Sequence, residues 1–384
     1  MKKNCILSIY TIISAVVSAY PSIYYGTEDL FDYEPGVKFP CDENKSSWVA
    51  SIGIGSPQQV FPLRIDTSTD FTWVAGITCH SDFCSAQNDH LFDAGKSHSI
   101  TNLHKQVVFD YGNEEIVEAN LYKDKFILGS ADLNNFRFGK AFNVTGFDEY
   151  DFAGSIGLGA SYEDLKANIT LTKRAIYRPV STRGRGRNAR SISRRNNVLQ
   201  EDLCEIGFGV DKTAISGDIA WFDIPTCDFG KSPFWKTKLT GVQVQDAISL
   251  ELDTLASFDT TVKQIQVPQN DLDSIYRVLN AKQSETTNKY EFKCCEAKDL
   301  IFSFEKFDIK LPSDVWTTPT DKEAYCTANF KPLEPNRDRL DNIWRLGIDF
   351  LNNFFSVYSL KRRQTGLALL SGNRSEGICI TSKE

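Results

Sequence analysis

Short runs of alternating or continuous apolar residues dominate the chain, and most are bounded by Gly, Asn, Asp or Pro. Runs of this length and punctuation are typical of β-strands, whose side chains alternate between two faces. The clearest predicted strands are Trp48–Gly55, Phe61–Asp66, Gln106–Tyr111, Ile116–Tyr122, Asp218–Phe222 and Phe354–Leu360. The pattern therefore predicts a mostly β protein.

Helical periodicity is rare. The clearest helix is predicted over Asn270–Leu279, where apolar residues recur every three or four positions and Asn270 or Asp271 is a candidate N-cap. A short helix is also expected within Glu149–Leu165, after its glycines. Helices are therefore a minor part of the predicted fold.

Length and charge limit the classes of protein that fit this pattern. The chain has 384 residues, 41% of them hydrophobic, which is enough for one large domain or two moderate ones. Its formal net charge is -7, so no general attraction to nucleic acid or to an acidic membrane is expected. A metal site is also disfavoured, because compact ligand spacing is missing among the four histidines His80, His90, His98 and His104.

One segment departs from this composition. Leu171–Arg195 carries nine Lys or Arg residues and no acid. Such a block repels itself, so we predict a solvated, mobile surface loop. Cleavage by secretory processing proteases, at Arg187–Arg190 or Arg194-Arg195, is the main alternative to an inert loop. A nucleic-acid-binding arm is a further alternative, which the predicted secretion opposes.

The N-terminus predicts export from the cytosol. Residues 1–19 combine Lys2 and Lys3, an apolar run and the small residues Val17-Ser18-Ala19, as a secretory signal peptide does. The apolar run is too short for a membrane anchor, and no later segment is long and apolar enough to span a bilayer. We therefore expect a secreted protein with no membrane partner.

Cysteines and glycosylation sequons agree with that compartment. Of ten cysteines, nine remain once Cys5 is removed with the signal, and disulfides are the default outside the cytosol. The odd number leaves at least one thiol free or paired with another chain. The four Asn-x-Ser/Thr sequons begin at Asn44, Asn143, Asn168 and Asn373.

The first candidate for chemistry is Asp66, a carboxylate at the end of an apolar strand. Burying it is costly unless it is hydrogen-bonded or takes part in a reaction. Its surroundings, "SSWVASIGIGSPQQVFPLRIDTSTDFTWV", resemble the opening of pepsin-like aspartic proteases. That family has Asp-Thr-Gly-Ser followed by a tryptophan, and here the corresponding residues are Asp66-Thr67-Ser68-Thr69 and Trp73.

Further segments resemble the same family in the same order. "FDYGNEE" is similar to the flap, with Tyr111-Gly112 at the position of its tyrosine and glycine. "FAGSIGLG" over Phe152–Gly159 resembles the Phe-Asp-Gly-Ile-Leu-Gly-Leu run, and Ile343–Leu369 resembles the terminal Trp-x-Leu-Gly-Asp-x-Phe segment with its following strands. The resemblance covers roughly Trp48 to Leu369, less the basic insert.

The resemblance implies a bilobal double β-barrel with short helices and a cleft between the lobes. Its division of the chain is a signal peptide at 1–19, a short segment at 20–47, an N-terminal lobe at 48–208 with the basic insert 171–195, and a C-terminal lobe at 209–384. It also implies two disulfides, Cys79 with Cys84 and Cys294 with Cys326. The sequence leaves open the pairing of Cys41, Cys204, Cys227, Cys295 and Cys379.

The family's second aspartate has two candidates, Asp253 and Asp259, each followed by threonine. Asp259 is preferred, because Pro268 and the predicted helix Asn270–Leu279 then follow at the family's spacing, and Trp235 precedes at a matching distance. Asp66 and the second aspartate would share one proton, so that one activates a water while the other polarises the peptide carbonyl.

Other residues take family roles around this pair. Thr67 and Thr260 would hold the two loops together and Trp73 would support the site, while Tyr111 and Gly112 would contact substrate. The implied partner is a polypeptide in the cleft, with no cofactor, metal or nucleic acid. A monomer is expected, secreted or in the lumen of an acidic compartment.

Several positions depart from the family pattern. Ser68 and Thr261 replace the glycine after each Asp-Thr, where the backbone passes close to the carboxylates. Thr69 keeps the hydroxyl that usually bonds the aspartate, and Val262 loses it. Glu114-Glu115 adds acids to the flap, and residues 20–47 are too short and too acidic for an inhibitory propeptide.

Two functions therefore remain open. One is a secreted aspartic endopeptidase that uses Asp66 and Asp259 to activate water within degenerate catalytic loops. The alternative is a catalytically silent homologue that binds peptide or protein.

Overall fold

The structure is a computed structural model of the whole chain. It describes residues 47–383 apart from 88, 113, 130, 148–150, 160–173, 177–202, 209–213, 226–234, 245–246, 286–288, 334–342, 360–361 and 372–376, and the backbone of three earlier strands. The predicted signal and most of the basic insert lie outside the described residues. The exceptions are two short strands, β1 (Ile13–Ala15) in the predicted signal and β11 (Arg174–Ile176) in the insert; β1 pairs with β2 (Ile23–Tyr25) of the following segment.

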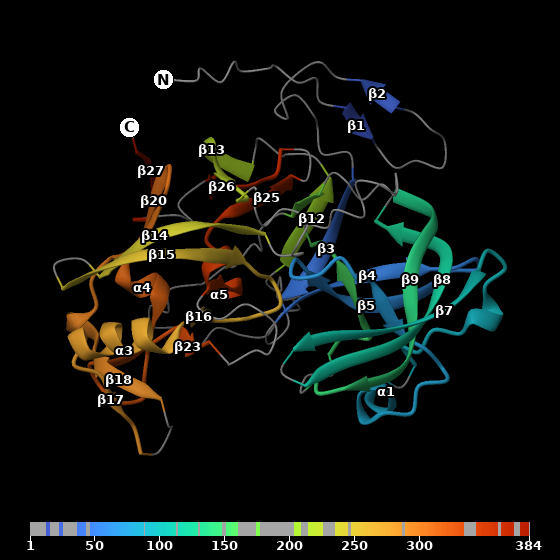
Figure 1. Cartoon of the computed structure of the whole chain (residues 1–384), viewed down its shortest axis with the longest axis horizontal. Coiled ribbons are helices and arrows are strands. Elements are labelled where there is room, and N and C mark those ends of the chain that lie inside the picture. Colours follow the sequence, from blue (N-terminus) through green and yellow to red (C-terminus); the bar gives the residue numbers. More distant parts are fainter. Residues whose placement is uncertain are drawn as a thin grey trace, which may run out of the picture.

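The fold is mostly β with few short helices, as expected, and its strands gather in two β-rich parts (Figure 1). The largest sheet has 13 strands. In spatial order they are β13 (Ile215–Asp223), β26 (Gln364–Leu370), β25 (Phe355–Ser359), β11, β12 (Leu203–Phe208), β3 (Val37–Glu43), β4 (Trp48–Ile54), β5 (Gln59–Asp66), β10 (Gly154–Gly157), β6 (Trp73–Ala75), β9 (Ala131–Thr145), β8 (Glu115–Leu128) and β7 (Thr101–Gly112).

The second part holds a sheet of eight strands and one of four. The larger runs β23 (Phe330–Pro332), β16 (Ile265–Val267), β24 (Trp344–Leu346), β15 (Ile248–Phe258), β14 (Lys236–Val244), β19 (Leu300–Phe304), β20 (Phe307–Leu311) and β27 (Cys379–Ser382). The smaller runs β17 (Lys282–Gln283), β18 (Tyr290–Lys293), β22 (Tyr325–Ala328) and β21 (Thr317–Pro319).

The helices are short and lie at the edges of these sheets. They are α1 (Asp82–Ala86), α3 (Gln269–Val278), α4 (Ser313–Trp316) and α5 (Ile348–Leu351), with 3-10 turns at Ala94–Lys96 and Cys294–Glu296. Among the described residues, none of these helices has the length and apolar character needed to cross a membrane.

All six strands predicted from the sequence are present, and helix α3 confirms the prediction over Asn270–Leu279. Its cap differs, because Pro268 occupies the N-cap position and makes no side-chain bond. The short helix expected after the glycines of Glu149–Leu165 stays a prediction, because 160–165 lie outside the described residues. The stretch 154–157, which precedes it, forms strand β10.

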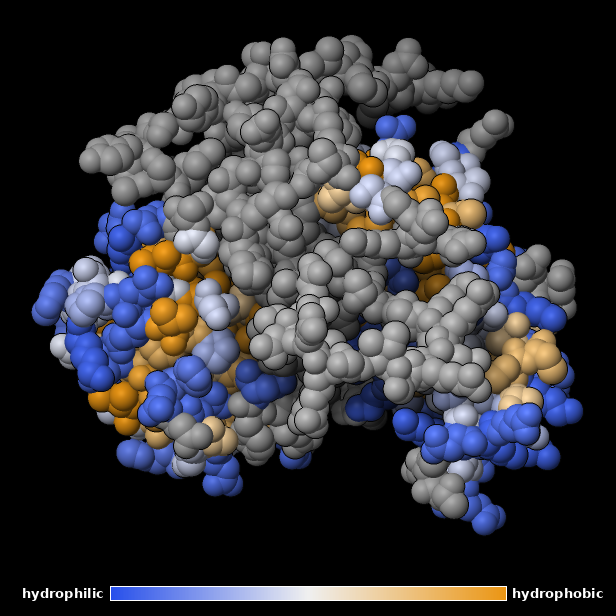
Figure 2. Space-filling model, turned by 180° about the vertical axis from the view of Figure 1, so that it is seen from behind, coloured by the Kyte–Doolittle hydropathy of each residue, from blue (hydrophilic) through white to orange (hydrophobic). Residues whose placement is uncertain are grey.

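Burial explains why these strands pack as they do. Five tryptophans, Trp48, Trp73, Trp235, Trp316 and Trp344, have 1% exposure or less. Large aromatic side chains contribute much of the apolar area that stabilises a core. From behind, hydrophilic side chains gather at the outer edges of both parts, while apolar side chains show nearer the middle (Figure 2).

Strands from both predicted lobes share the large sheet. β13, β25 and β26 come from residues after 208, yet they continue the sheet that contains β4 and β5. The boundary at 208 and 209 remains a prediction, and the two halves of the chain are joined by this common sheet.

Candidate active site

Asp66 and Asp259 occupy equivalent places in the two β-rich parts. Asp66 ends β5 and Asp259 directly follows β15, and neither side chain is exposed to solvent. Each of these strands has a parallel neighbour, β10 beside β5 and β24 beside β15. The neighbour places a glycine beside each aspartate, Gly157 or Gly347, where an added Cβ would come within 2.5 Å or 2.4 Å of backbone atoms. Glycine is required there by close packing.

Two threonines lock the Asp-Thr turns together. The Thr67 amide donates to Thr260 Oγ1 at 3.1 Å, and the Thr260 amide donates to Thr67 Oγ1 at 3.0 Å. Each hydroxyl also donates across the boundary, from Thr67 to the Phe258 carbonyl at 3.0 Å and from Thr260 to the Ile65 carbonyl at 2.7 Å. This reciprocal pattern fixes the two turns against each other.

The interlock also distinguishes the two candidates for the second aspartate. Asp259 precedes the interlocked Thr260, so it lies beside Asp66. The Asp253 side chain is 90% exposed and pairs with Lys238 at 3.2 Å. The structure therefore brings Asp259, and not Asp253, to the site.

Tyr111 reaches the site from the hairpin of β7 and β8. Trp73 Nε1 donates a hydrogen bond of 2.8 Å to the Tyr111 hydroxyl. The Tyr111 ring packs edge-to-face on Phe109 and Phe147, at centroid distances of 4.6 Å and 5.6 Å. The backbone of Gly112 pairs with Glu115 at the end of this hairpin.

The comparisons with known proteins agree with this geometry. The family model described as eukaryotic aspartyl protease matches residues 47–370, which is most of the chain. The chain belongs to the eukaryotic aspartyl protease family.

Curated relatives of this chain are distant but matched over most of its length. Pregnancy-associated glycoprotein 2 of Bos taurus is 24% identical over 84% of this chain and 82% of its own length. Plasmepsin VIII of Plasmodium berghei is 25% identical over 84% of this chain and 86% of its own. Aspartic-type endopeptidase ctsD of Aspergillus fumigatus is 26% identical over 86% of this chain and 66% of its own.

Two arginines, which motif reading missed, pair with these aspartates. Arg345 Nε and Nη2 donate to Asp259 Oδ2 at 2.9 Å and 2.6 Å, and its Nη1 donates to Gln266 Oε1 at 3.1 Å. Arg64 Nη2 lies 3.5 Å from Asp66 Oδ2. Each aspartate therefore has its own cation.

The two arginines occupy related positions on different strands of their pairs. Arg64 is on the strand that carries its own aspartate, and Arg345 is on the parallel neighbour of the strand that leads to Asp259. In the first part, Arg64 on β5 pairs in register with Ser155 on β10. In the second, Ser257 on β15 pairs with Arg345 on β24. Since alternate residues of a strand share a face, Arg64 could have been found from its spacing to Asp66. Arg345 occupies the variable position of the terminal motif, and only the strand pairing places it beside Asp259.

The Asp66 carboxylate accepts four hydrogen bonds from the protein. Oδ1 accepts from the Ser68 amide at 2.8 Å, the Ser68 hydroxyl at 2.6 Å and the Thr69 amide at 3.2 Å. Oδ2 accepts from the Ser155 hydroxyl at 3.2 Å and lies beside Arg64. A carboxylate offers about four lone-pair sites, and four protein donors bond this one, three at Oδ1 and one at Oδ2.

The Asp259 carboxylate also accepts four hydrogen bonds from the protein. Its Oδ1 accepts from the Thr261 amide at 2.9 Å and the Thr261 hydroxyl at 2.6 Å. Its Oδ2 accepts the two bonds from Arg345, so four donors meet about four lone-pair sites.

One expectation about the turns is wrong. The Thr69 hydroxyl does not bond the aspartate, because it accepts from the Phe71 amide at 3.0 Å. The hydroxyl of Ser68 bonds the aspartate in its place, and the Thr261 hydroxyl does the same in the second turn. The residues that replace glycine are therefore direct partners of the carboxylates.

The pKa values of the two carboxyl groups move in opposite directions. Burial raises the pKa of Asp66, and the negative charge of Asp259 adds to the rise, while Arg64 and Ser68 only partly offset it. Burial would also raise the pKa of Asp259, but Arg345 and the bonds from Thr261 outweigh it and lower the value. On acidification, Asp66 therefore takes up a proton before Asp259 does.

Arg64 stays protonated in this setting. Burial would lower its pKa, but the nearby negative charges of Asp66, Glu115 and Asp259 raise it above the ordinary value.

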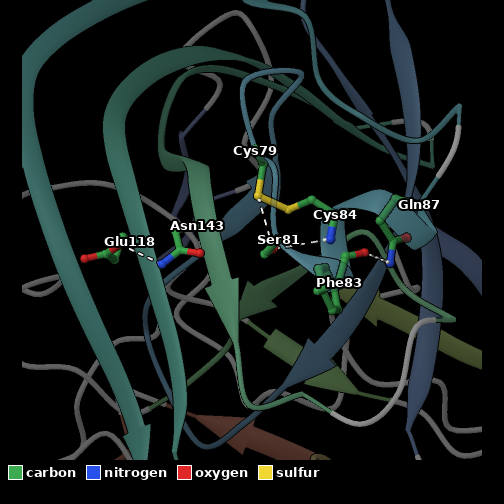
Figure 3. Close-up of a disulfide and its surroundings, with 7 residues drawn as sticks. All are labelled: Cys79, Ser81, Phe83, Cys84, Gln87, Glu118 and Asn143. Carbon is green, nitrogen blue, oxygen red and sulfur yellow. Dashed lines mark hydrogen bonds between the residues drawn. A yellow bond between two sulfur atoms is a disulfide. The ribbon is translucent and has the colours of Figure 1, made fainter.

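Two disulfides join the pairs expected from the family resemblance. Cys79 bonds Cys84, and the Ser81 hydroxyl caps the adjoining helix by accepting from the Cys84 amide at 3.4 Å (Figure 3). Cys294 bonds Cys326 across 32 residues.

Some of the remaining cysteines and one glycosylation sequon can also be placed. Cys295 and Cys379 are free and exposed. The backbone register sets Cys41 opposite Cys204, whose side chains lie outside the described residues, as does Cys227. The sequon residue Asn143 lies in β9 and donates to Glu118 at 2.8 Å (Figure 3).

No residue cluster suited to a metal ion occurs in the described part of the chain, whether of His, Cys, Asp or Glu. The four histidines considered earlier are dispersed in loops and strands of the first part.

Proposed function

We propose that this aspartyl protease homologue binds extended polypeptides between its two halves and does not cleave them. The observation that carries the proposal is the saturation of both carboxylates by donors from the protein itself. A general base must accept a proton from the attacking water, which requires a lone pair directed at that water. Asp66 and Asp259 have four or more protein donors each, so water competes with bonds that already exist.

The arginines strengthen this argument. The family mechanism needs two carboxyl groups that share one proton. Two hydrogen bonds from Arg345 to Oδ2 stabilise ionised Asp259, and charge-assisted bonds are among the strongest in proteins. In the family mechanism the two carboxyl groups exchange one proton through water. Here each carboxyl group instead has an arginine cation beside it.

Polypeptide binding is supported by what the chain retains. The Thr67–Thr260 interlock preserves the arrangement of the two halves, and the Trp73–Tyr111 bond holds the flap tyrosine over the site. These features concern the shape of the binding region and do not require proton transfer.

The second candidate is an acid endopeptidase. It is favoured by the opposite pKa shifts, which would leave Asp66 protonated and Asp259 ionised in mild acid, as an acid and a base must be. Two of the relatives also carry the names plasmepsin and endopeptidase. In this case some donors to Asp259 must give way to water during turnover.

A secreted or lumenal location belongs to the same proposal. Its support is the signal-like segment at 1–19, the two disulfides and the location expected for this family. A monomer is proposed for the binding form.

The test measures binding and cleavage side by side. The mature protein is titrated with a non-cleavable transition-state peptide mimic and incubated at acid pH with the cleavable parent peptide. We expect the mimic to bind and the parent peptide to remain intact. Cleavage that Asp66→Asn and Asp259→Asn both abolish would establish the endopeptidase instead.

A further inference from the structure

The two arginines differ in how their donors are used. Arg345 directs Nε and Nη2 at the Asp259 carboxylate and Nη1 at Gln266. Arg64 Nε and Nη2 are buried and make no hydrogen bond to any described residue. The contact of Arg64 with Asp66 is an ion pair at 3.5 Å, which is longer than a good charge-assisted bond.

This difference needs an explanation, because buried donors in native proteins nearly always have a partner. The Nε–Nη2 edge of a guanidinium matches the two oxygens of a carboxylate. Within the same site the corresponding edge of Arg345 holds the Asp259 carboxylate, with both Nε and Nη2 donating to Oδ2. The same edge of Arg64 lacks such a partner among the described residues.

Aromatic rings surround the Arg64 guanidinium. Its central carbon lies 4.9 Å from the Phe152 ring, 5.4 Å from Phe147 and 5.5 Å from Tyr111. Rings at these distances stabilise the cation and exclude water, which strengthens any further charge contact. The side chain is only 6% exposed, so it is a built feature of the interior and not a surface charge.

The flap hairpin contributes one of the rings that cover Arg64, that of Tyr111. Tyr111 lies near the end of β7, the outermost strand of the 13-stranded sheet, which has β8 as its neighbour. Movement of this hairpin end would carry the Tyr111 ring away and open a path to the guanidinium. Arg64 and Asp66 are two residues apart on one strand face, so a ligand reaching Arg64 also lies beside Asp66.

We propose that Arg64 binds a carboxylate of the polypeptide ligand through its Nε–Nη2 edge. This inference rests on the proposed polypeptide binding, and it specifies that the bound polypeptide carries an acidic group. The carboxylate is either an Asp or Glu side chain or the C-terminus of the peptide, since both present the same two oxygens.

The charges around Arg64 predict how this binding depends on pH. Asp66, Glu115 and Asp259 are the acids that act on Arg64, Tyr111 is neutral, and Arg345 is committed to Asp259. A further anion is repelled while all three acids are ionised. Protonation of Asp66 removes one of these charges and releases Arg64 from its ion pair. Binding of the ligand carboxylate should therefore be tighter at mildly acidic than at neutral pH.

The experiment uses a set of apolar decapeptides with the mature full-length protein. One Glu or one Gln is placed at each position in turn, and each peptide is made with a free or amidated C-terminus. Dissociation constants are measured by calorimetry for the parent, for Arg64→Leu and for Lys140→Leu. Lys140 is a matched control, because it is another buried cation near an aromatic ring, that of Tyr122, in the same sheet.

At one position we expect Glu to bind at least about tenfold more tightly than Gln, the scale of one charge-assisted hydrogen bond. Arg64→Leu should remove this preference and still bind the Gln peptide, and Lys140→Leu should keep the preference. A preference for the free over the amidated C-terminus would assign the carboxylate to the chain end instead.

Three results would overturn the inference. Equal binding of all acidic and neutral peptides excludes a carboxylate site, and a preference that survives in Arg64→Leu assigns it to another residue. If no peptide binds, the proposed polypeptide binding fails and this inference fails with it. Cleavage of bound peptides with the Glu preference intact would refute only the silent function and would leave the role of Arg64 standing.

Discussion

At the scale of the residue, the site is governed by charge pairs that a motif search does not register. Asp66 and the Asp-Thr turn could be predicted from the sequence, because the order of residues there carries the signal. Arg345 could not be assigned in the same way, because a charge within a strand normally faces solvent, whereas the spacing of Arg64 to Asp66 on one strand already placed both on one face. Only the pairing of β15 with β24 shows that Arg345 faces inward.

The Arg345–Asp259 pair makes a first prediction. Arg345→Met should lower the free energy of unfolding at neutral pH by about 3–5 kcal/mol, because it leaves an uncompensated buried carboxylate. The measurement is chemical denaturation. The control is Lys238→Met, which removes an exposed partner of Asp253 and should change stability by about 0–1 kcal/mol. Equal effects of the two substitutions would contradict the role given to the buried pair.

The opposite pKa shifts make a second prediction. Carbon-13 NMR titration should show the Asp66 carboxyl titrating above the usual Asp value of about 3.9, and Asp259 below it. The pKa of Asp66 is raised, so its contribution to stability is present at low pH and lost as pH rises through the folded pKa. That of Asp259 is lowered, so its contribution is present above the unfolded pKa and lost as pH falls. Two carboxyl groups that titrate together would refute this asymmetry.

At the scale of the element, strands were predictable where apolar alternation is strong, as in β4, β5 and β25. The hairpin of β7 and β8 extends well beyond its predicted core, because these half-exposed strands include polar residues on both faces. Strand β10 was not predicted from apolar alternation. Its four residues are all buried, and a short buried run has no periodicity that separates strand from helix.

The disulfides give a third prediction, at this scale. Replacing Cys294 and Cys326 by serine should lower the free energy of unfolding by about 3–4 kcal/mol, and the same change at Cys79 and Cys84 by about 2 kcal/mol, because the first pair closes a longer loop. Cys295→Ser is the control and should have little effect, since its thiol is free and exposed. A larger loss from the short loop would show that strain or local packing dominates.

At the scale of the whole molecule, hydrogen bonds connect the β-rich parts. Among them are those of the threonine interlock and the bond of 2.8 Å from Trp235 Nε1 to the Leu158 carbonyl. The sequence predicted two lobes and the matching threonines through family resemblance. It could not predict that β13, β25 and β26 join the first sheet, because that choice depends on contacts between distant segments.

The interlock gives a fourth prediction. Thr260→Val should lower the free energy of unfolding by about 1–3 kcal/mol, because the buried Thr67 amide loses its acceptor. Thr240→Val is the control, since it removes a single bond to the Ser303 carbonyl within one sheet. Denaturation followed by tryptophan fluorescence measures both. A Thr260→Val effect no larger than that of the control would show that the interlock contributes little to the union of the two parts.

The central claim is that saturated carboxylates, and not a defective fold, prevent cleavage. A restored variant removes the added donors and leaves the two aspartates, the threonine interlock and the flap in place. Its substitutions are Arg64→Val, Ser68→Gly, Thr261→Gly and Arg345→Ile.

The most direct measurement is the initial rate at which the parent and this restored variant cleave one extended apolar peptide at acid pH, after both are shown to be folded. The account predicts no cleavage by the parent above the level of its Asp66→Asn form. It predicts measurable cleavage by the restored variant, which Asp66→Asn abolishes. Brisk cleavage by the parent that disappears in Asp66→Asn and in Asp259→Asn would contradict the account, because the carboxylates would then activate water despite their bound donors.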